Sequence, residues 1–575
     1  LDLGRRNPGA RPGCNPTATS WVRLLVRTLA SRIEAAAGAP CSVTFVTGGV
    51  EDRVPWGRLH DDARAMAAAL QARGVAPGQH VALLGPTTRP LVTAIQAVWL
   101  CGATLVVLPL PMRLASIEEF VVQTRARIRN ADADLLVVDP DLAAFIEPQS
   151  GDPPIVLLTD LLAGPGRPTA AQFDRPRYDP GALALLQFTS GSTSDPKGVM
   201  LPHTTICANL DGIASAAQLD LDLDVVVSWL PLYHDMGLVG ILMLTMTTGA
   251  NLVLGAPQDF LAAPIRWMEW LSTYRGTATA GPNFSYVLAT RALRSASGLD
   301  LSPLRIALNG AEPVDPDQVE RFIEAAGRFG MRPGAVYPAF GMAEVVIGGT
   351  FPEPLSGLRT DAVERPVLET ELYAAPTDPS SPHARRLALL GRPVPGLEIR
   401  IVDPESGTVL QDREVGELEF RGSSVTPGYY KRPDVIAAAF RDGWLRTGDL
   451  GYTLGGELVV CGRIKDVIIV GGRNVFPEDV ERAVASIEGV RAGNVIAFGV
   501  EGHRGKEGVV VVAESRSDDG DLTRKFVAER VRETVGLPPR DIVLVAPGTL
   551  PKTSSGKLQR SLCRQRYLGR ELQPV

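Results

Sequence analysis

A loop rich in glycine, hydroxyl side chains and one lysine lies between Phe188 and Gly198, with the sequence FTSGSTSDPKG. It directly follows ALALLQ, an apolar run typical of a buried strand. Backbone N–H groups and hydroxyls in such a loop can surround phosphate oxygens. The G-x-x-x-x-G-K-[ST] spacing of nucleotide hydrolases is absent. Composition alone leaves a flexible surface loop as an equally favoured interpretation.

Six further motifs follow this loop in order: PLYHDMGLVG (231–240), LNGAEPV (308–314), FGMAE (340–344), GWLRTGDLG (443–451), GRIKDVIIVGGRNVFPEDVE (462–481) and PKTSSGKLQR (551–560). Together with the loop they resemble the core motifs of the adenylate-forming superfamily, which contains acyl-CoA synthetases, luciferases and peptide-synthetase adenylation domains. The resemblance covers nearly the whole chain beyond residue 40. One motif would be weak evidence, but the ordered set is specific.

The resemblance implies an ATP site. Its phosphate loop is matched by Thr189, Ser190, Gly191, Ser192, Thr193 and Lys197. Phe340 takes the place of the usual tyrosine that stacks on adenine, and a phenyl ring preserves that contact. Asp449 matches the carboxylate that accepts hydrogen bonds from the ribose hydroxyls, with Arg463 as its helper. Further nucleotide contacts are implied for Asn309, Gly310, Ala311, Gly341 and Met342.

Three residues are implied in catalysis. Lys557 matches a lysine that bridges the substrate carboxylate and the α-phosphate, where a cation offsets the repulsion between two anions. Glu344, the last residue of FGMAE, matches the magnesium ligand of the family. A carboxylate oxygen suits that hard cation. His234 matches a histidine of the acid pocket. Without the motifs, Lys557 would be a surface charge and His234 a structural hydrogen-bonding partner of its neighbouring aspartate.

Several details resemble fatty acyl-AMP ligases within the superfamily, among them SWLPLYHDMGL, GPNFSY and GGRNVFPEDVE. A polar stretch, residues 353–386, lies where those ligases carry an insertion that restrains a C-terminal lid. The resemblance implies that ATP and a fatty acid give acyl-AMP and pyrophosphate, and that the acyl group passes to the thiol of a carrier protein. Apolar residues of 236–244 and 282–286 are expected to line the acid pocket, with plain core packing as the alternative.

Two other interpretations stay open. The first is a fatty acid–CoA ligase that makes acyl-CoA through the same acyl-AMP. The second is a non-catalytic acyl- or ATP-binding scaffold, which is disfavoured because Lys557, Glu344 and Asp449 are all present. Lys465 occupies the hinge position of the family, where the lid rotates between two half-reactions.

The bulk composition describes a globular protein. Hydrophobic residues make up 45% of 575 residues and charged residues 21%. The net charge of -6 gives no broad basic surface for nucleic acid. Six scattered cysteines, none in a C-x-x-C pair, disfavour a disulfide framework or zinc site and fit the cytoplasm. The uncharged run at 236–258 is broken by Gly, Thr, Asn and Pro, which favours a buried helix, turn and strand over a membrane span.

The pattern of elements predicts an α/β protein with several parts. Strand-like runs at 80–85, 103–109 and 135–139 alternate with helical ones, which predicts parallel sheets covered by helices. We expect a loose tail over 1–20, a large domain over 21–464 with a β-rich subdomain at 390–464, and a small α+β lid domain over 465–575. The stretch 353–386 is predicted to be a functional insertion or a mobile loop.

Overall fold

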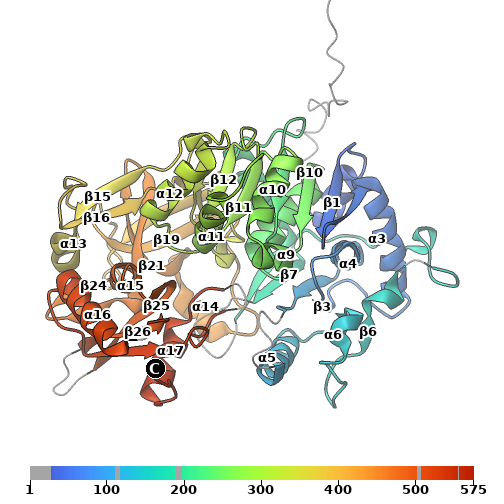
Figure 1. Ribbon diagram of the computed structural model, residues 1–575. Helices are drawn as coiled ribbons and strands as arrows, with labels where there is room; N and C mark the ends of the chain where they lie inside the picture. The colour runs from blue at the N-terminus through green and yellow to red at the C-terminus, as the bar shows by residue number, and fades with distance from the viewer. Residues whose placement is uncertain are drawn as a thin grey trace, which may run out of the picture.

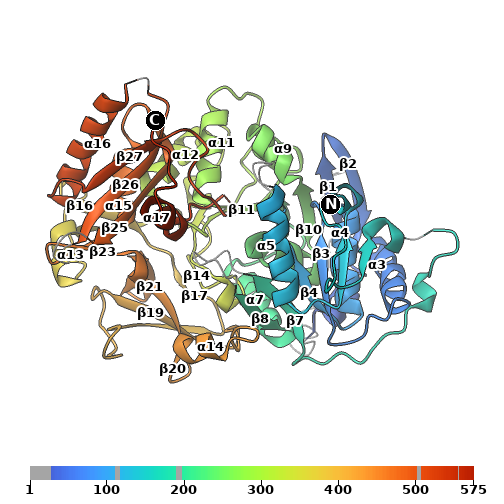
Figure 2. The same cartoon turned by 90° about the horizontal axis from the view of Figure 1, so that it is seen from below.

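The structure is a computed structural model that describes residues 28–110, 117–162, 164–188, 197–501, 507–517, 519–553 and 556–575. The first helices and strands lie at one end of the molecule and the C-terminal elements at the other (Figure 1). Figure 2 shows the same order from below, with the middle of the chain between the two ends. The predicted loose tail, residues 1–20, lies outside the described residues.

The first sheet has the strand order β6-β5-β3-β4-β7-β8. Strands β3, β4 and β5 pair in parallel, as the alternating runs predicted, and the predicted α/β class is confirmed. β7 and β8 are antiparallel neighbours joined by the glycine-rich loop. The bounds are β3 His80–Leu84, β4 Thr104–Val107, β5 Leu135–Val138, β6 Ile155–Leu157, β7 Leu183–Phe188 and β8 Gly198–Pro202.

The second sheet has the order β13-β12-β11-β9-β10-β1-β2. All its neighbouring strands are parallel except β1 and β2, which form an antiparallel hairpin at one edge. The bounds are β1 Ser42–Thr47, β2 Val50–Pro55, β9 Val225–Ser228, β10 Asn251–Gly255, β11 Ala278–Gly281, β12 Ile306–Asn309 and β13 Val336–Pro338. Because parallel strands end at one edge, the motifs that follow β9, β11, β12 and β13 meet there.

Helices cover both sheets, as parallel strands buried on two faces require. They include α3 Trp56–Gln71, α4 Arg89–Leu100, α5 Ile117–Asn130, α7 His203–Ala216, α10 Ile265–Thr273, α11 Asn283–Leu293 and α12 Pro316–Gly327. The amphipathic pattern of α12 is typical, because Val319, Phe322 and Ala326 are buried at helical spacing while polar residues face outward.

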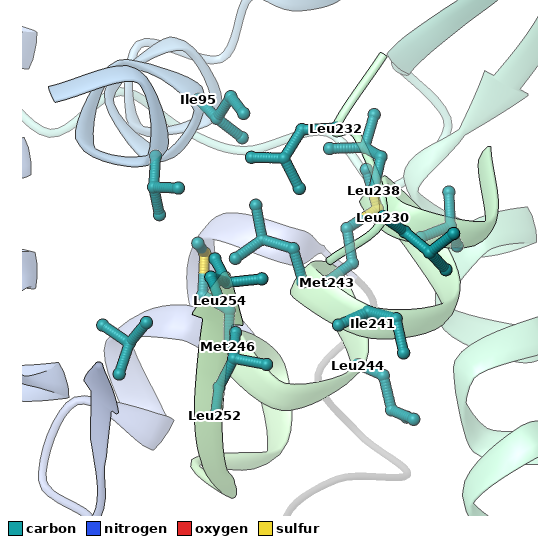
Figure 3. Packing of buried hydrophobic residues seen from close by; sticks show 14 of the residues in the cluster. Ile95, Leu230, Leu232, Leu238, Ile241, Met243, Leu244, Met246, Leu252 and Leu254 are labelled. Atoms are coloured by element: carbon teal, nitrogen blue, oxygen red, sulfur yellow. The ribbon is translucent and has the colours of Figure 1, made fainter. Parts of the chain in front are cut away.

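The uncharged stretch after His234 is a buried helix followed by a strand, as predicted. A wide π-type helix, η4 Met236–Met243, continues into α8 Leu244–Thr248 and ends at Gly249, whose φ of 75° suits glycine. Strand β10 follows. In Figure 3, Leu238, Met243 and Met246 of these helices pack against Leu252, Leu254 and neighbouring core residues. In the described part of the chain, no helix is both long and apolar enough to span a bilayer.

A β-rich sheet follows. Its strands are antiparallel in the order β18-β19-β21-β20, and β22 also pairs with β21. The bounds are β18 Leu397–Val402, β19 Gly416–Gly422, β20 Phe440–Arg441, β21 Trp444–Leu454 and β22 Glu457–Arg463. The TGD and GR motifs therefore lie on two paired strands.

The chain beyond Asp466 builds a hydrophobic core of its own, and we call residues 467–575 the C-terminal unit. Its main sheet has the order β25-β26-β27, and α16 buries Thr523, Val527, Val531 and Val535 at four-residue spacing. The bounds are β23 Ile468–Val470, β24 Arg473–Val475, α15 Pro477–Ala485, β25 Val490–Glu501, β26 Glu507–Ser515, α16 Gly520–Val535, β27 Asp541–Val545 and α17 Arg560–Leu568.

Segment 353–386 contains an ordered strand and helix. Strand β15 Thr360–Glu364 pairs antiparallel with β16 Ala384–Ala388, and α13 Arg365–Glu371 lies between them in sequence. Its apolar side chains belong to a cluster that also takes residues from the β-rich sheet and the C-terminal unit. This shared cluster contains Val363, Leu368, Ala374, Leu387, Leu389, Val415, Leu450, Tyr452, Val459, Cys461 and Phe476.

Candidate active site

A cavity of about 2360 Å³ lies at the carboxyl edge of the second sheet, between it, the β-rich sheet and the C-terminal unit. Most of the predicted site residues that the structure describes line it: Lys197, His234, Gly310, Ala311, Phe340, Gly341, Met342, Glu344, Asp449, Arg463, Lys465 and Lys557. Thr189, Ser190, Gly191, Ser192 and Thr193 lie outside the described residues. Asn309 is buried beneath the cavity wall, where its Nδ2 donates to Asn283 Oδ1 at 3.1 Å.

Asp449 and Arg463 face each other across paired strands. They are register partners in β21 and β22, and Arg463 Nε donates to Asp449 Oδ1 at 2.7 Å. The second oxygen, Asp449 Oδ2, is buried without a hydrogen-bond partner among the described residues. Burial raises the pKa of Asp449, while the charge and hydrogen bond of Arg463 act to lower it. A buried acceptor in this state is suited to the hydroxyl donors of a ligand.

Glu344 lies in a short turn held by strained backbone. Its Oε1 accepts a hydrogen bond from the Tyr429 hydroxyl at 2.9 Å. Burial raises the pKa of Glu344, and the Tyr429 hydrogen bond acts to lower it. Two residues later, Val346 has φ 73° and ψ -60°, which is rare for a β-branched residue. Such strain persists where the surroundings fix the backbone, and it often marks functional sites.

His234 and Asp235 form a close pair at the start of η4. His234 Nδ1 lies 2.6 Å from Asp235 Oδ1. Burial alone would raise the pKa of Asp235, but His234 and then Lys557 lower it to about 2. The Asp235 carboxylate is therefore ionised at neutral pH and keeps a negative charge opposite the lysine of the C-terminal unit.

Close backbone packing shapes the cavity wall around Phe340 and Gly341. A Cβ on Gly341 would lie 1.8 Å from the Ile347 carbonyl oxygen. Only glycine therefore fits at this position, in the turn between Phe340 and Thr350. Phe340 is held by paired backbone hydrogen bonds with Thr350 and lies parallel to Phe420, with ring centroids 6.0 Å apart. Lys197 lies over the Tyr429 ring at 5.6 Å.

A tight turn of the C-terminal unit carries Lys557 to the cavity. Thr553 organises the turn, because its N–H donates to the Lys557 carbonyl at 2.8 Å and its Oγ1 accepts from the Lys557 N–H at 3.1 Å. Gly556 has φ 89°, a conformation that suits glycine. Lys557 also borders a small apolar pocket with His234 and Phe284. The Lys557 cation of the C-terminal unit is thus brought close to the carboxylate of Asp235.

The residues predicted to line the acid pocket divide into two groups, one that lines the cavity and one that packs in the core. Met236, Gly240, Ile241 and Leu244 line the cavity along one side of the helix, and Asn283 and Phe284 line it from α11. The alternative of core packing applies to the other side, where Leu238 and Met243 are fully buried in the main hydrophobic cluster. Tyr286 is also buried, and its hydroxyl donates to the Leu308 carbonyl at 2.7 Å.

Asp235, Glu312, Tyr429 and Lys552 are among the cavity residues that were not predicted from the sequence. Asp235 and Glu312 lie inside recognised motifs, so their acidic type next to His234 and Ala311 was an available signal. Tyr429 follows β19 in a loop that no motif covers, and only the fold brings it to Glu344.

Known proteins resemble this chain over most of its length. The AMP-binding enzyme family matches residues 33–430. A ligase of Mycobacterium tuberculosis, Rv1013, is 41% identical, with 88% of this chain and 94% of that protein covered. The long-chain-fatty-acid–AMP ligase FadD26 of Mycobacterium bovis is 32% identical over 90% of this chain and 92% of its own length. The same values hold for a relative named as a fatty-acid–CoA ligase, FadD25 of Mycobacterium tuberculosis.

Solved structures agree with these relatives. A structure from a study of fatty acyl-adenylate ligases from E. coli and L. pneumophila has a TM-score of 0.87 at 29% identity, covering 95% of this chain and 98% of that one. A McyG A-PCP structure complexed with phenylalanyl-adenylate has a TM-score of 0.83 at 27% identity, with 94% and 95% covered. With a family match over most of its length and relatives above 30% identity, the chain belongs to the AMP-binding enzyme family.

Proposed function

We propose that this protein activates a fatty acid by joining it to AMP from ATP, with release of pyrophosphate. The observation that carries the proposal is the meeting of Lys557, His234, Glu344, Asp449 and Arg463 around one cavity. The cavity has polar groups for a nucleotide and an apolar helix face for an acyl chain. The relatives named as fatty-acid–AMP ligases support the choice of acid.

The reaction needs no covalent nucleophile from the protein. A carboxylate oxygen of the fatty acid attacks the α-phosphorus, and the bond from that phosphorus to the pyrophosphate oxygen breaks. Lys557 stabilises the negative charge that gathers at the reacting centre. Asp449 Oδ2 accepts from the ribose hydroxyls, and Phe340 stacks on the adenine. The protein therefore acts by positioning and by charge.

Glu344 is the proposed magnesium ligand. Magnesium is usually held by one or two carboxylates together with phosphate oxygens and water, and the carboxylate of Glu344, which lines the same cavity as Lys197, fits that pattern. Within the described ranges, no group of three or more metal-ligating side chains occurs. The ion would neutralise phosphate charge, and Glu344 would hold it through the oxygen that Tyr429 leaves available.

We infer that the chain divides at Lys465 and that the C-terminal unit acts as a lid. Segment 353–386 joins the two parts through Arg385, which is buried. Its Nε donates to Asp479 of α15 at 2.9 Å, and another guanidinium nitrogen donates to the Cys461 carbonyl at 2.8 Å. The same guanidinium lies over the Phe476 ring at 4.4 Å. These contacts restrain rotation about Lys465, as an insertion that favours adenylation would.

The proposed second step passes the acyl group to the thiol of a carrier protein. The A-PCP neighbour supports a carrier domain as the kind of partner. A fatty acid–CoA ligase is the second candidate, favoured by the relative named FadD25. The restraint by segment 353–386 favours the first candidate, because a lid held in one arrangement is less able to admit CoA.

The test is pyrophosphate release with a panel of fatty acids, followed by mass analysis of products with CoA, with a carrier protein bearing its pantetheine thiol, and with neither. We expect acyl-AMP in every case and an acylated carrier, with little acyl-CoA. Rapid acyl-CoA formation would establish the CoA ligase instead. Absence of acyl-AMP with every fatty acid would contradict the activity itself.

A further inference from the structure

The turn that carries Lys557 rests on an aromatic ring of the large part of the chain. A Cβ placed on Gly556 would lie 3.7 Å from Cε1 and 3.8 Å from Cζ of Phe284, so Gly556 faces that ring with space for a methyl group between them. Phe284 is itself fixed by Trp229, with ring centroids 6.2 Å apart in an edge-to-face arrangement. The position of the turn therefore depends on where Phe284 lies.

A carboxylate lies beside this contact. Glu312 follows β12 and lines the same cavity as Lys557 and Lys552. Its Oε2 accepts the N–H of Phe284 at 3.1 Å, in the first turn of α11, where backbone donors lack helical partners. Burial raises the pKa of Glu312, and the positive charge of Lys557 is the largest influence that lowers it, ahead of Lys552. The carboxylate and the lysines thus attract each other across the two parts of the chain.

We propose that Glu312 is a positioning residue for Lys557, and that Glu312 and Phe284 together form the seat that receives the Gly556–Lys557 turn. The inference rests on the proposed adenylation. The ring sets the depth at which the turn stops, and the carboxylate draws the lysine toward the reacting centre. Glu312 acts through Lys557 and does not touch the reacting atoms.

A purely structural role would be to cap α11, and the variants separate the two roles. Glu312→Gln keeps an oxygen that accepts the Phe284 N–H but removes the charge, whereas Glu312→Asp keeps the charge. If Glu312 positions Lys557, Glu312→Gln lowers kcat for acyl-AMP formation about tenfold, equivalent to about 1.4 kcal/mol. The KM values for ATP and fatty acid stay within about twofold, since the effect concerns the transition state. Glu312→Asp recovers most of the loss.

Coupling to Lys557 is the decisive measurement. In a Lys557→Ala background, Glu312→Gln should cause no further loss, because the residue it positions is gone. Phe284→Leu, which keeps the backbone N–H, should lower kcat and show the same lack of additivity. Thermal unfolding of each variant checks that the fold is intact. Glu324→Gln, on the exposed face of α12, is the matched control and should leave the rate unchanged.

Three results would overturn the proposal: a normal rate in Glu312→Gln, an equal loss in the presence and absence of Lys557, or an equal loss in Glu312→Gln and Glu312→Asp. Each would leave Glu312 as a cap of α11. A natural chain that forms no acyl-AMP with any fatty acid is a different outcome, which contradicts the proposed function and not this inference alone.

Discussion

Lys557 of the C-terminal unit lies close to His234 and Asp235. Lys557→Ala should lower the rate of acyl-AMP formation by roughly 10²- to 10³-fold, because a preorganised charge at the reacting centre is lost. The Kd for ATP should change by no more than about twofold, since the charge acts mainly in the transition state. Pyrophosphate release and equilibrium ATP binding measure the two effects.

Lys525→Ala is the control, because Lys525 is an exposed lysine on α16 of the same unit. Its rate should equal that of the natural chain. Near-normal pyrophosphate release by Lys557→Ala would rule out the assigned role.

Burial raises the pKa of Glu344, and the hydrogen bond from Tyr429 acts against that effect. Tyr429→Phe keeps the ring beneath Lys197 but removes the hydroxyl that lowers the pKa of Glu344. Burial already raises the pKa of Glu344, so the variant should bind a proton at a still higher pH. A protonated carboxyl is a poor magnesium ligand. We expect the magnesium concentration for half-maximal activity to rise about tenfold at low pH, because a hydrogen bond to a charged group contributes ~1.5 kcal/mol. The difference should shrink as the pH rises, because Glu344 then ionises in both forms.

The neighbouring Tyr430→Phe gives a matched control. Its hydroxyl donates to Asp132 at 2.8 Å, and Tyr430 does not line the cavity. Its magnesium dependence should be that of the natural chain at each pH. A magnesium dependence of Tyr429→Phe that is shifted equally at all pH values would contradict the titration argument.

Motif order predicted most of the candidate site but not its supporting contacts. Asp449 and Arg463 were assigned from separate motifs, and their pairing follows from the register of β21 and β22. Tyr429 could not be placed, and Phe284 was expected only as a pocket-lining residue, because the contacts they make depend on tertiary packing between segments far apart in sequence. The family-derived contact of Asn309 stays a prediction, and its side chain donates to Asn283, which lines the cavity.

At the scale of elements, the narrow turn between Phe340 and Thr350 is the most restrictive part of the site. Gly341→Ala places a methyl group where the Ile347 carbonyl lies 1.8 Å away, so the turn must open. We expect the Kd for ATP to rise at least about tenfold and the thermal midpoint to fall, as overpacking costs ~1–3 kcal/mol.

Gly327→Ala is the comparison, since Gly327 ends α12 with no atom within 4 Å of an added Cβ. It should leave ATP binding unchanged. ATP affinity retained by Gly341→Ala would mean that the turn adapts and does not shape the nucleotide site.

Periodicity predicted the regular elements better than the irregular ones. Runs such as HVALLG became strands because their side chains are buried on both faces of a parallel sheet. Segment 353–386 was predicted to be either a functional insertion or a mobile loop, because its sequence is mainly polar and has few apolar residues. Val363, Leu368 and Ala374 of this segment are nevertheless buried in the shared cluster, and their partners lie in other parts of the chain. No local pattern contains that information.

At the scale of the whole molecule, Phe476 links the C-terminal unit to the rest. It is fully buried in the shared cluster, beside Arg385. The proposed rotation of the C-terminal unit about Lys465 would withdraw this ring, and burial of a phenylalanine side chain contributes ~1.5–3 kcal/mol. A tenfold population shift needs only about 1.4 kcal/mol. Phe476→Ala should therefore increase acyl-CoA formation by at least about fivefold while acyl-AMP formation continues.

Two further variants make this result interpretable. Phe526→Ala alters a half-exposed ring on α16 and should not increase acyl-CoA formation. Phe476→Leu preserves most of the apolar contact and should give an intermediate increase. If neither Phe476 variant forms acyl-CoA although both form acyl-AMP, the restraint is not what excludes CoA.

The sharing of one apolar cluster also bears on whether the protein can be divided. A cut between Ile464 and Lys465 would leave most of the shared cluster as an exposed apolar socket on the first fragment. Phe476, the aromatic side chain that fills it, would lie on the second fragment. Each fragment alone would expose this surface and tend to aggregate. Produced together in one cell, the two fragments should find each other through the socket and reassemble without a covalent link.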